Sequence, residues 1–132
     1  MKLRVYYEDT DAAGIVYHAN FIKFCERARS ELFFSSNIQA FTKNRHFVVT
    51  SINAKFIKTA FLGDILEIKS KAKEIKKASI IIEQNIYRIA SIEKPLNKPE
   101  LVFNADIKLA FVLDKKPAKM DKDIIDFLNK IS

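Results

Sequence analysis

The sequence predicts an α+β domain in which an antiparallel sheet covers one long helix. Three observations support this class. Residues 20–35 carry apolar side chains at helical spacing, residues 66–73 and 101–113 alternate with a period of two, and hairpin-length connections join the later segments. Because a long apolar helix face needs a sheet to cover it, we expect a curved five-stranded antiparallel sheet wrapped around the helix, with a short C-terminal helix.

The N-terminal part begins with a predicted strand from Leu3 to Tyr7, followed by a tight polar turn. Glycine occurs only at Gly14 and Gly63, so both mark special turns. The long helix is predicted from Asn20, a suitable N-cap, to about Ser35. Its apolar stripe consists of Phe21, Phe24, Cys25, Ala28 and Leu32. A short helical turn is expected from Ile38 to Asn44.

Four further strands are expected at residues 47–60, 66–73, 79–92 and 101–113. Turns at 62–64 and 76–78 and a loop at 93–98, bounded by Pro95 and Pro99, separate these strands. A closing helix is predicted from Asp121, its cap, to Ile131. The apolar face of this helix consists of Ile124, Phe127, Leu128 and Ile131.

Length and composition fit one domain, residues 1–132, which buries roughly two-thirds of its unfolded surface. The single cysteine, Cys25, excludes an intrachain disulfide and favours a reducing, cytoplasmic location. No apolar run approaches the ~20 residues of a transmembrane helix.

The net charge of +7 is compatible with binding of nucleic acid, an anionic membrane surface or a small polyanion, or with a plain lysine-rich surface. The lysines are scattered and no arginine-rich arm occurs. We therefore favour phosphates on a small ligand and expect no nucleic-acid partner.

Asp11 lies close to the predicted start of the long helix, where unpaired backbone N–H groups stabilise negative charge. A carboxylate beside such donors is a minimal set for hydrolysing an activated carbonyl. The spacing alone leaves a second reading open, in which Asp11 is an ordinary turn or capping residue.

The segments Arg4–Phe21 and Glu26–Glu31 resemble the acyl-CoA thioesterases of the 4-hydroxybenzoyl-CoA thioesterase family, in particular the YbgC type that is associated with the bacterial Tol-Pal envelope system. Segments 58–67 and 110–114 match less strongly. The resemblance covers essentially the whole chain. It implies the hot-dog fold and hydrolysis of acyl-CoA thioesters without a cofactor or metal.

The resemblance also implies roles for individual residues. Asp11 takes the position of the catalytic carboxylate, the backbone N–H of His18 that of the group polarising the thioester carbonyl, and Tyr7 lies near the carboxylate. Candidates for binding the CoA phosphates are Lys76, Lys77 and Lys115, with Lys116 beside the last. Ala13 and Phe21 depart from the family pattern, and we expect neither to take part in the chemistry.

Several alternatives stay open. Asp11 acts either as a general base or as a nucleophile. The imidazole of His18 either contacts the substrate or Asp11, or has no role beside that of the His18 backbone amide. A metal site is not expected, since His46 is the only other histidine. Cys25 is expected in the core. Two sets of charged residues are expected at the surface: Glu8 and Asp9 in the turn, and Glu26, Arg27, Arg29 and Glu31 on the helix.

Hot-dog domains of this kind pair their sheets edge to edge, which implies a homodimer or homotetramer with active sites between subunits. The second hypothesis is an interaction protein that binds acyl carrier protein or envelope-biosynthesis enzymes and has weak or vestigial hydrolase activity. The sequence does not reveal the acyl group, the choice between CoA and carrier-protein thioesters, or the physiological role.

Overall fold

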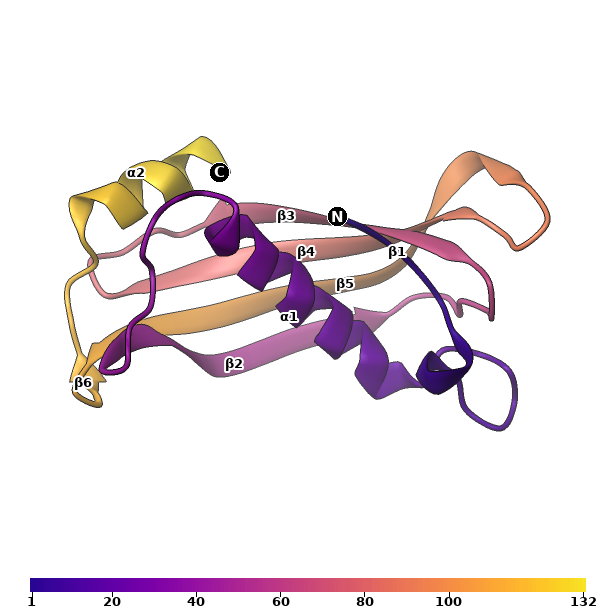
Figure 1. Ribbon diagram of the computed structural model, residues 1–132, viewed down its shortest axis with the longest axis horizontal. Helices are drawn as coiled ribbons and strands as arrows, with labels where there is room; N and C mark the ends of the chain where they lie inside the picture. The colour runs from indigo at the N-terminus through magenta and orange to yellow at the C-terminus, as the bar shows by residue number, and fades with distance from the viewer. The chain divides into compact units, whose positions relative to one another are not determined.

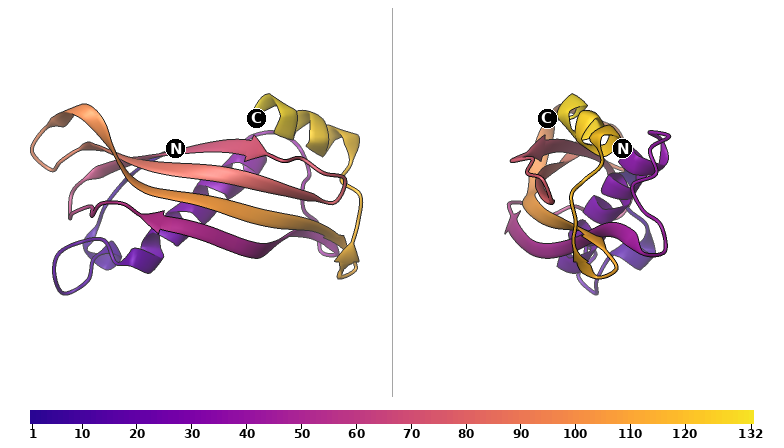
Figure 2. Two further views of the ribbon diagram at one scale, coloured as in Figure 1. Left: turned by 180° about the vertical axis from the view of Figure 1, so that it is seen from behind. Right: turned by 90° about the vertical axis from the view of Figure 1, so that its left-hand side faces the viewer.

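The computed structural model describes residues 1–132. Its elements are, in order, β1 (Lys2–Arg4), the 3-10 turn η1 (Tyr7–Asp9), α1 (His18–Phe34), β2 (Arg45–Phe56), β3 (Ile65–Lys73), β4 (Ser79–Ala90), β5 (Pro95–Leu113), β6 (Lys116–Pro117) and α2 (Lys122–Lys130). The strands pair in the order β1-β3-β4-β5-β2, and the two-residue β6 adds to β5 (Figures 1 and 2). The α+β class and the five main strands are therefore confirmed.

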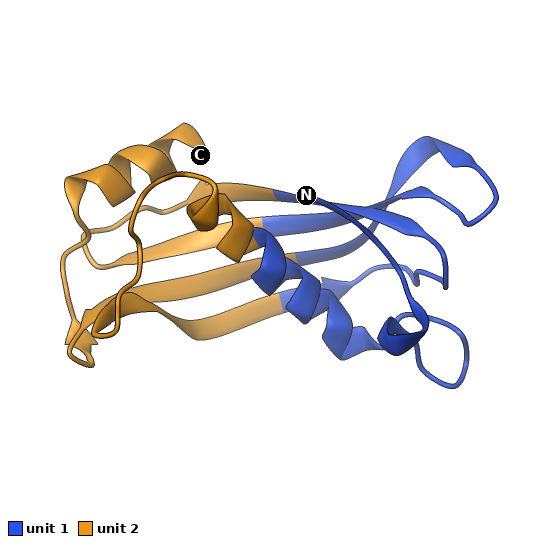
Figure 3. Ribbon diagram, viewed as in Figure 1, with its two compact units in different colours: residues 1–28, 54–69, 84–104 blue, residues 29–53, 70–83, 105–132 orange.

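The chain divides into two compact units (Figure 3). Unit 1 comprises residues 1–28, 54–69 and 84–104, and unit 2 comprises residues 29–53, 70–83 and 105–132. Helix α1 and strands β2 to β5 contribute residues to both units.

In unit 1, the first part of α1 packs its apolar stripe against the strands. Phe21, Phe24, Cys25 and Ala28 are buried, as their spacing predicts. The Phe21 ring stacks on Phe103 of β5 with 5.4 Å between centroids. The buried Gln84 side chain of β4 donates a hydrogen bond of 3.0 Å to the Cys25 carbonyl. The core position expected for Cys25 is confirmed.

In unit 2, an aromatic cluster joins the end of α1 to β2 and α2. Phe33 lies 5.5 Å from both Phe47 and Phe127, measured between ring centroids. Ile124 and Leu128 of α2 are buried, so the predicted helix and its apolar face are confirmed. Asp121 is the N-cap residue but makes no capping hydrogen bond. Its carboxylate pairs with Arg45 instead.

The N-terminal boundaries differ from expectation. Strand β1 ends at Arg4 because the Asp9 carboxylate accepts the Tyr6 N–H at 2.9 Å and bends the chain into η1. Helix α1 begins at His18, so Asn20 lies inside it and is not its cap. The helical turn expected at 38–44 is wrong, since that segment contains no helix.

Other boundaries shift in the strands. Strand β2 ends at Phe56, four residues earlier than predicted. Strand β5 begins at Pro95, so the loop expected at 93–98 is shorter. Proline is tolerated as the first residue of a strand because its missing N–H breaks no ladder there.

The surface position expected for one charged residue of α1, Arg29, is wrong. Arg29 is buried, whereas Glu26, Arg27 and Glu31 are exposed as expected. Arg29 lies four residues before the buried Phe33, which places it beside the apolar face of the helix and not on the solvated side.

The two glycines provide a matched pair for stability measurements. Both have positive φ, +79° at Gly14 and +85° at Gly63, which strains any other residue. A methyl group at Gly63 also meets the Cβ of Ile92 at 2.6 Å, while one at Gly14 has open space. We expect Gly14→Ala to lower the free energy of unfolding by about 1–2 kcal/mol and Gly63→Ala by about 3 kcal/mol or more. Equal losses in chemical denaturation would show that contact with Ile92 adds no strain.

Candidate active site

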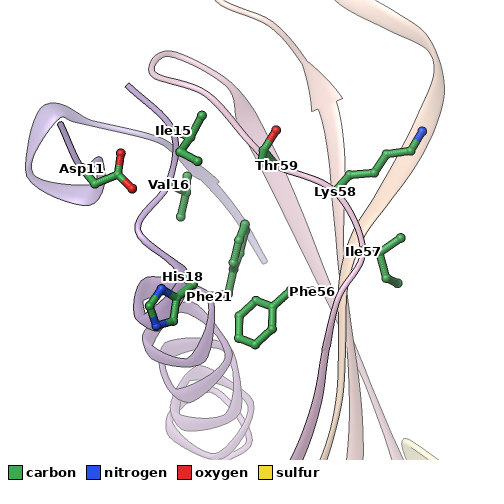
Figure 4. Close-up of a pocket in the computed structure, with 9 residues that line it drawn as sticks. All are labelled: Asp11, Ile15, Val16, His18, Phe21, Phe56, Ile57, Lys58 and Thr59. Atoms are coloured by element: carbon green, nitrogen blue, oxygen red, sulfur yellow. The ribbon is translucent and has the colours of Figure 1, made fainter. Parts of the chain in front are cut away.

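Unit 1 contains a cleft of about 260 Å³. It is lined by Asp11, Ile15 and Val16 of the loop before α1, by His18 and Phe21 of α1, and by residues 56–59 at the end of β2 (Figure 4). Segments from three parts of the chain therefore meet around Asp11.

The loop of residues 10–16 is a small hairpin that holds Asp11. Thr10 and Val16 form an antiparallel bridge, and the Asp11 N–H donates to the Ile15 carbonyl at 2.9 Å. The Gly14 N–H donates a hydrogen bond to the Asp11 carbonyl at 3.0 Å. One carboxylate oxygen of Asp11 accepts the Ala13 N–H at 2.8 Å, which orients the side chain.

The hairpin is attached on two sides. The Val16 N–H donates to the Ala60 carbonyl at 2.8 Å, and Ile15 bridges Phe61. On the side of α1, the Asp9 carbonyl accepts the Tyr17 N–H at 3.0 Å and the Asn20 side-chain amide at 2.8 Å. Asp11 is therefore exposed to solvent, while hydrogen bonds hold its backbone against residues 60–61 and α1.

His18 is the first residue of α1 and lies at the same cleft as Asp11. Its exposed ring lies 4.6 Å from the Tyr17 ring and contacts Phe56 edge-on at 5.9 Å. The first N–H groups of a helix lack acceptors within it. The Asn20 N–H donates to the Tyr17 carbonyl at 2.8 Å, which leaves the amides of His18 and Ala19 as the donors of this terminus.

Aromatic side chains form one wall of the cleft. Phe56 packs 5.2 Å from Phe103 and 6.4 Å from Phe21. Phe21, which we expected to lie apart from the chemistry, is thus part of the wall. Segment 58–67 matched the family pattern only weakly, and the sequence did not indicate Phe56 and Ile57, although an apolar pair at the end of a strand was a usable signal.

The structure separates Tyr7 from the other predicted site residues. Tyr7 lies in η1 with 82% of its surface exposed and does not line the cleft. Glu8 is exposed as expected. The surface position expected for Asp9 is wrong, because its side chain is buried and accepts the Tyr6 N–H.

The lysines predicted to bind phosphates lie in unit 2 and do not line the cleft. Lys76 and Lys77 occupy the turn between β3 and β4, and Lys115 lies between β5 and β6. The lysine that lines the cleft is Lys58, whose amino group points away from Asp11 (Figure 4). No cluster of three or more His, Cys, Asp or Glu side chains suited to a metal is present.

The strand order and the long helix describe the hot-dog fold, and one cleft brings together the Asp11 carboxylate and His18, the first residue of that helix. The family model described as Thioesterase superfamily matches residues 13–91, and the chain belongs to this family. The resemblance seen in the sequence is thereby confirmed. None of the helices is long and apolar enough to cross a bilayer.

Individual relatives agree with this assignment. The chain is 47% identical over 112 residues to the acyl-CoA thioesterase YbgC of Helicobacter pylori, covering 85% of this chain and 84% of the relative. It is 35% identical over 124 residues to the acyl-CoA thioesterase YbgC of Haemophilus influenzae, covering 83% and 90%. The crystal structure of a probable thioesterase from Bartonella henselae superposes with a TM-score of 0.74 at 28% identity, covering 92% and 96%.

Asn20 provides a test of how the hairpin is attached to α1. Asn20→Ala removes the hydrogen bond to the Asp9 carbonyl and should cost about 1 kcal/mol of stability. Asn20→Asp keeps the shape but sets a carboxylate against a carbonyl oxygen, so at neutral pH it should cost more than the alanine variant. The difference should shrink below about pH 4, where the introduced carboxyl group is protonated and donates. Equal denaturation curves for both variants at neutral pH would contradict this attachment.

Proposed function

We propose that the protein hydrolyses the thioester bond of acyl-CoA to give a free acid and CoA. The observation that carries this proposal is the meeting of Asp11 and the N-terminus of α1 at one cleft. The names of the YbgC relatives, acyl-CoA thioesterases, support the choice of substrate. Cys25 is the single cysteine and is buried, so the chain cannot form an internal disulfide, which accords with action in the reducing cytoplasm.

The chemistry of a thioester requires few catalytic groups. The leaving group is a thiolate, whose conjugate thiol has an ordinary pKa near 8.5, so it departs without prior protonation. A carboxylate and a set of oxyanion donors therefore suffice. Donors at a helix N-terminus are each worth on the order of 10²–10³ in rate.

Two roles for Asp11 are consistent with its position. As a general base, its free carboxylate oxygen removes a proton from water while the water oxygen bonds to the carbonyl carbon, for roughly 10²–10⁴ in rate. As a nucleophile, it bonds to the carbonyl carbon and expels the thiolate, and water then opens the mixed anhydride. In both routes the His18 amide binds the developing oxyanion, and the carbon–sulfur bond breaks.

We further propose that two copies pair along β2. This strand ends the strand order and has β5 as its neighbour, so its outer edge presents unpaired backbone groups. It also exposes large apolar side chains: Val48, Val49, Ile52, Phe56 and Ile57, the last immediately after the strand. Because Phe56 and Ile57 also line the cleft, this pairing brings partner residues to its rim. The phosphate roles of Lys76, Lys77 and Lys115 stay a prediction, since none of these lysines lines the cleft.

Replacing the carboxylate tests the enzyme and its mechanism together. With short, long and aromatic acyl-CoAs, we expect Asp11→Asn to lower kcat by a hundredfold or more, because the amide is neither base nor nucleophile. Thiol release is the measurement, and Glu8→Gln, which alters an exposed carboxylate nearby, is the control.

Each other outcome has a distinct meaning. Full activity of Asp11→Asn would remove Asp11 from the mechanism. Failure of the wild type on every acyl-CoA would overturn the proposed substrate, and carrier-protein thioesters would be tested next.

A charge on the edge strand tests the proposed pairing. Ile52→Lys should shift the protein from dimer or tetramer to monomer in analytical ultracentrifugation, because a buried interface rarely accepts an unpaired ammonium group. Leu113→Lys is the matched control, since Ile52 and Leu113 are each 41% exposed. A wild type that sediments as a monomer would contradict the pairing.

A further inference from the structure

An ion pair with a buried carboxylate lies in unit 1, between Asp64 and Arg88, and Glu100 lies 3.9 Å from the same guanidinium. The Asp64 side chain, in the turn before β3, is 2% exposed. Arg88 of β4 binds it with both arms of its guanidinium, with Nε at 2.6 Å from Oδ2 and Nη2 at 3.3 Å from Oδ1. Because removing two charges from water is costly, a buried pair of this kind is weak as a stabilising device and invites another explanation.

The Asp64 carboxylate holds the turn of residues 61–64. Its Oδ2 accepts the Phe61 N–H at 2.8 Å, and its own backbone N–H donates to the Phe61 carbonyl at 3.0 Å. The Arg88 guanidinium also lies over the Phe61 ring, 5.4 Å from its centroid. Asp64 and Arg88 together therefore fix both the backbone and the ring of Phe61.

Phe61 is the residue that bridges the hairpin of residues 10–16. It pairs with Ile15, and the Ile15 carbonyl accepts the Asp11 N–H. A continuous series of contacts thus runs from Arg88 through Asp64, Phe61 and Ile15 to Asp11. All five residues belong to unit 1.

We propose that Asp64 and Arg88 are positioning residues that hold the Asp11 carboxylate in register with the N-terminus of α1. This inference rests on the proposed function of Asp11. A carboxylate on a surface hairpin is catalytically useful only if its distance to the substrate carbonyl is maintained, since a misplacement of about 1 Å can cost on the order of 100-fold in rate. The ion pair provides that constraint although neither Asp64 nor Arg88 lines the cleft.

Three substitutions separate positioning from general stabilisation. Arg88→Met keeps much of the aliphatic side chain and removes the guanidinium group. Arg88→Lys keeps the positive charge but loses the two hydrogen bonds of the guanidinium group. Asp64→Asn removes the negative charge but keeps an oxygen that accepts the Phe61 N–H. The control is Asp106→Asn in unit 2, which breaks the ion pair between Lys73 and Asp106. That pair is more exposed, and its hydrogen bond from Lys73 to Asp106 raises the pKa of Lys73 above its ordinary value.

Steady-state kinetics are measured well below the unfolding temperature of each variant. Arg88→Met should lower kcat by about 10- to 100-fold with KM changed by less than about threefold, because the residues that line the cleft are untouched. Arg88→Lys should recover part of the loss, and Asp106→Asn should retain wild-type kcat. Unchanged kcat in folded Arg88→Met, or no difference between the Lys and Met variants, would overturn the inference.

Amide hydrogen exchange gives a second readout that needs no substrate. The Asp11 and Phe61 amides should exchange at least tenfold faster in Arg88→Met than in the wild type, whereas Asp106→Asn should leave both unchanged. If the wild type hydrolyses no thioester, the proposed function fails while this measurement still tests the series of contacts. If Asp11 exchange is unaffected by Arg88→Met, the positioning role is overturned even in an active enzyme.

Discussion

The bridge between Ile15 and Phe61 is the contact on which the geometry of the cleft depends. The hairpin of residues 10–16 is too short to be stable alone, since an isolated pair of strands is marginal in water. Its internal hydrogen bonds define its shape, but only its attachments to residues 60–61 and to α1 define its place. Asp11 can therefore be exposed to solvent and still be held in place by hydrogen bonds.

The electrostatics of unit 1 follow from that constraint. The turn that carries Phe61 has a positive-φ glycine at its centre and exposes backbone groups that need acceptors and donors. Asp64 provides an acceptor for the Phe61 N–H, and the Arg4 guanidinium donates to the Gly63 carbonyl at 2.9 Å. The buried charge of Asp64 in turn requires Arg88. The polar groups around the turn are thus mutually satisfied, which rigidifies a segment that hydrophobic packing alone leaves free to shift.

Local patterns predicted the parts of the fold that depend on local physics. Periodicity found α1, α2 and most of the strands, and the motif around Asp11 and His18 indicated two residues that the structure brings to one cleft. Features that depend on distant partners were missed. The pairing of Asp64 with Arg88 and the role of residues 56–59 in the cleft each arise from segments far apart in the sequence. Helix α1 starts earlier than predicted because the chain around Tyr17 is held by the Asp9 carbonyl, which no propensity encodes.

In a single chain the cleft is open to solvent, so the proposed pairing of two copies bears on catalysis. Asp11 and His18 are both exposed, so water competes for the carboxylate and for the helix amides. Electrostatic stabilisation of an oxyanion grows as the local dielectric constant falls, and excluding water also removes competing hydrogen bonds. If β2 pairs as proposed, a partner subunit and the bound acyl group close the side of the cleft formed by Phe56 and Ile57. In that case the apolar edge of β2, which is exposed in the monomer, excludes water from the cleft. A substitution on β2 that disrupts pairing then also lowers kcat without altering Asp11.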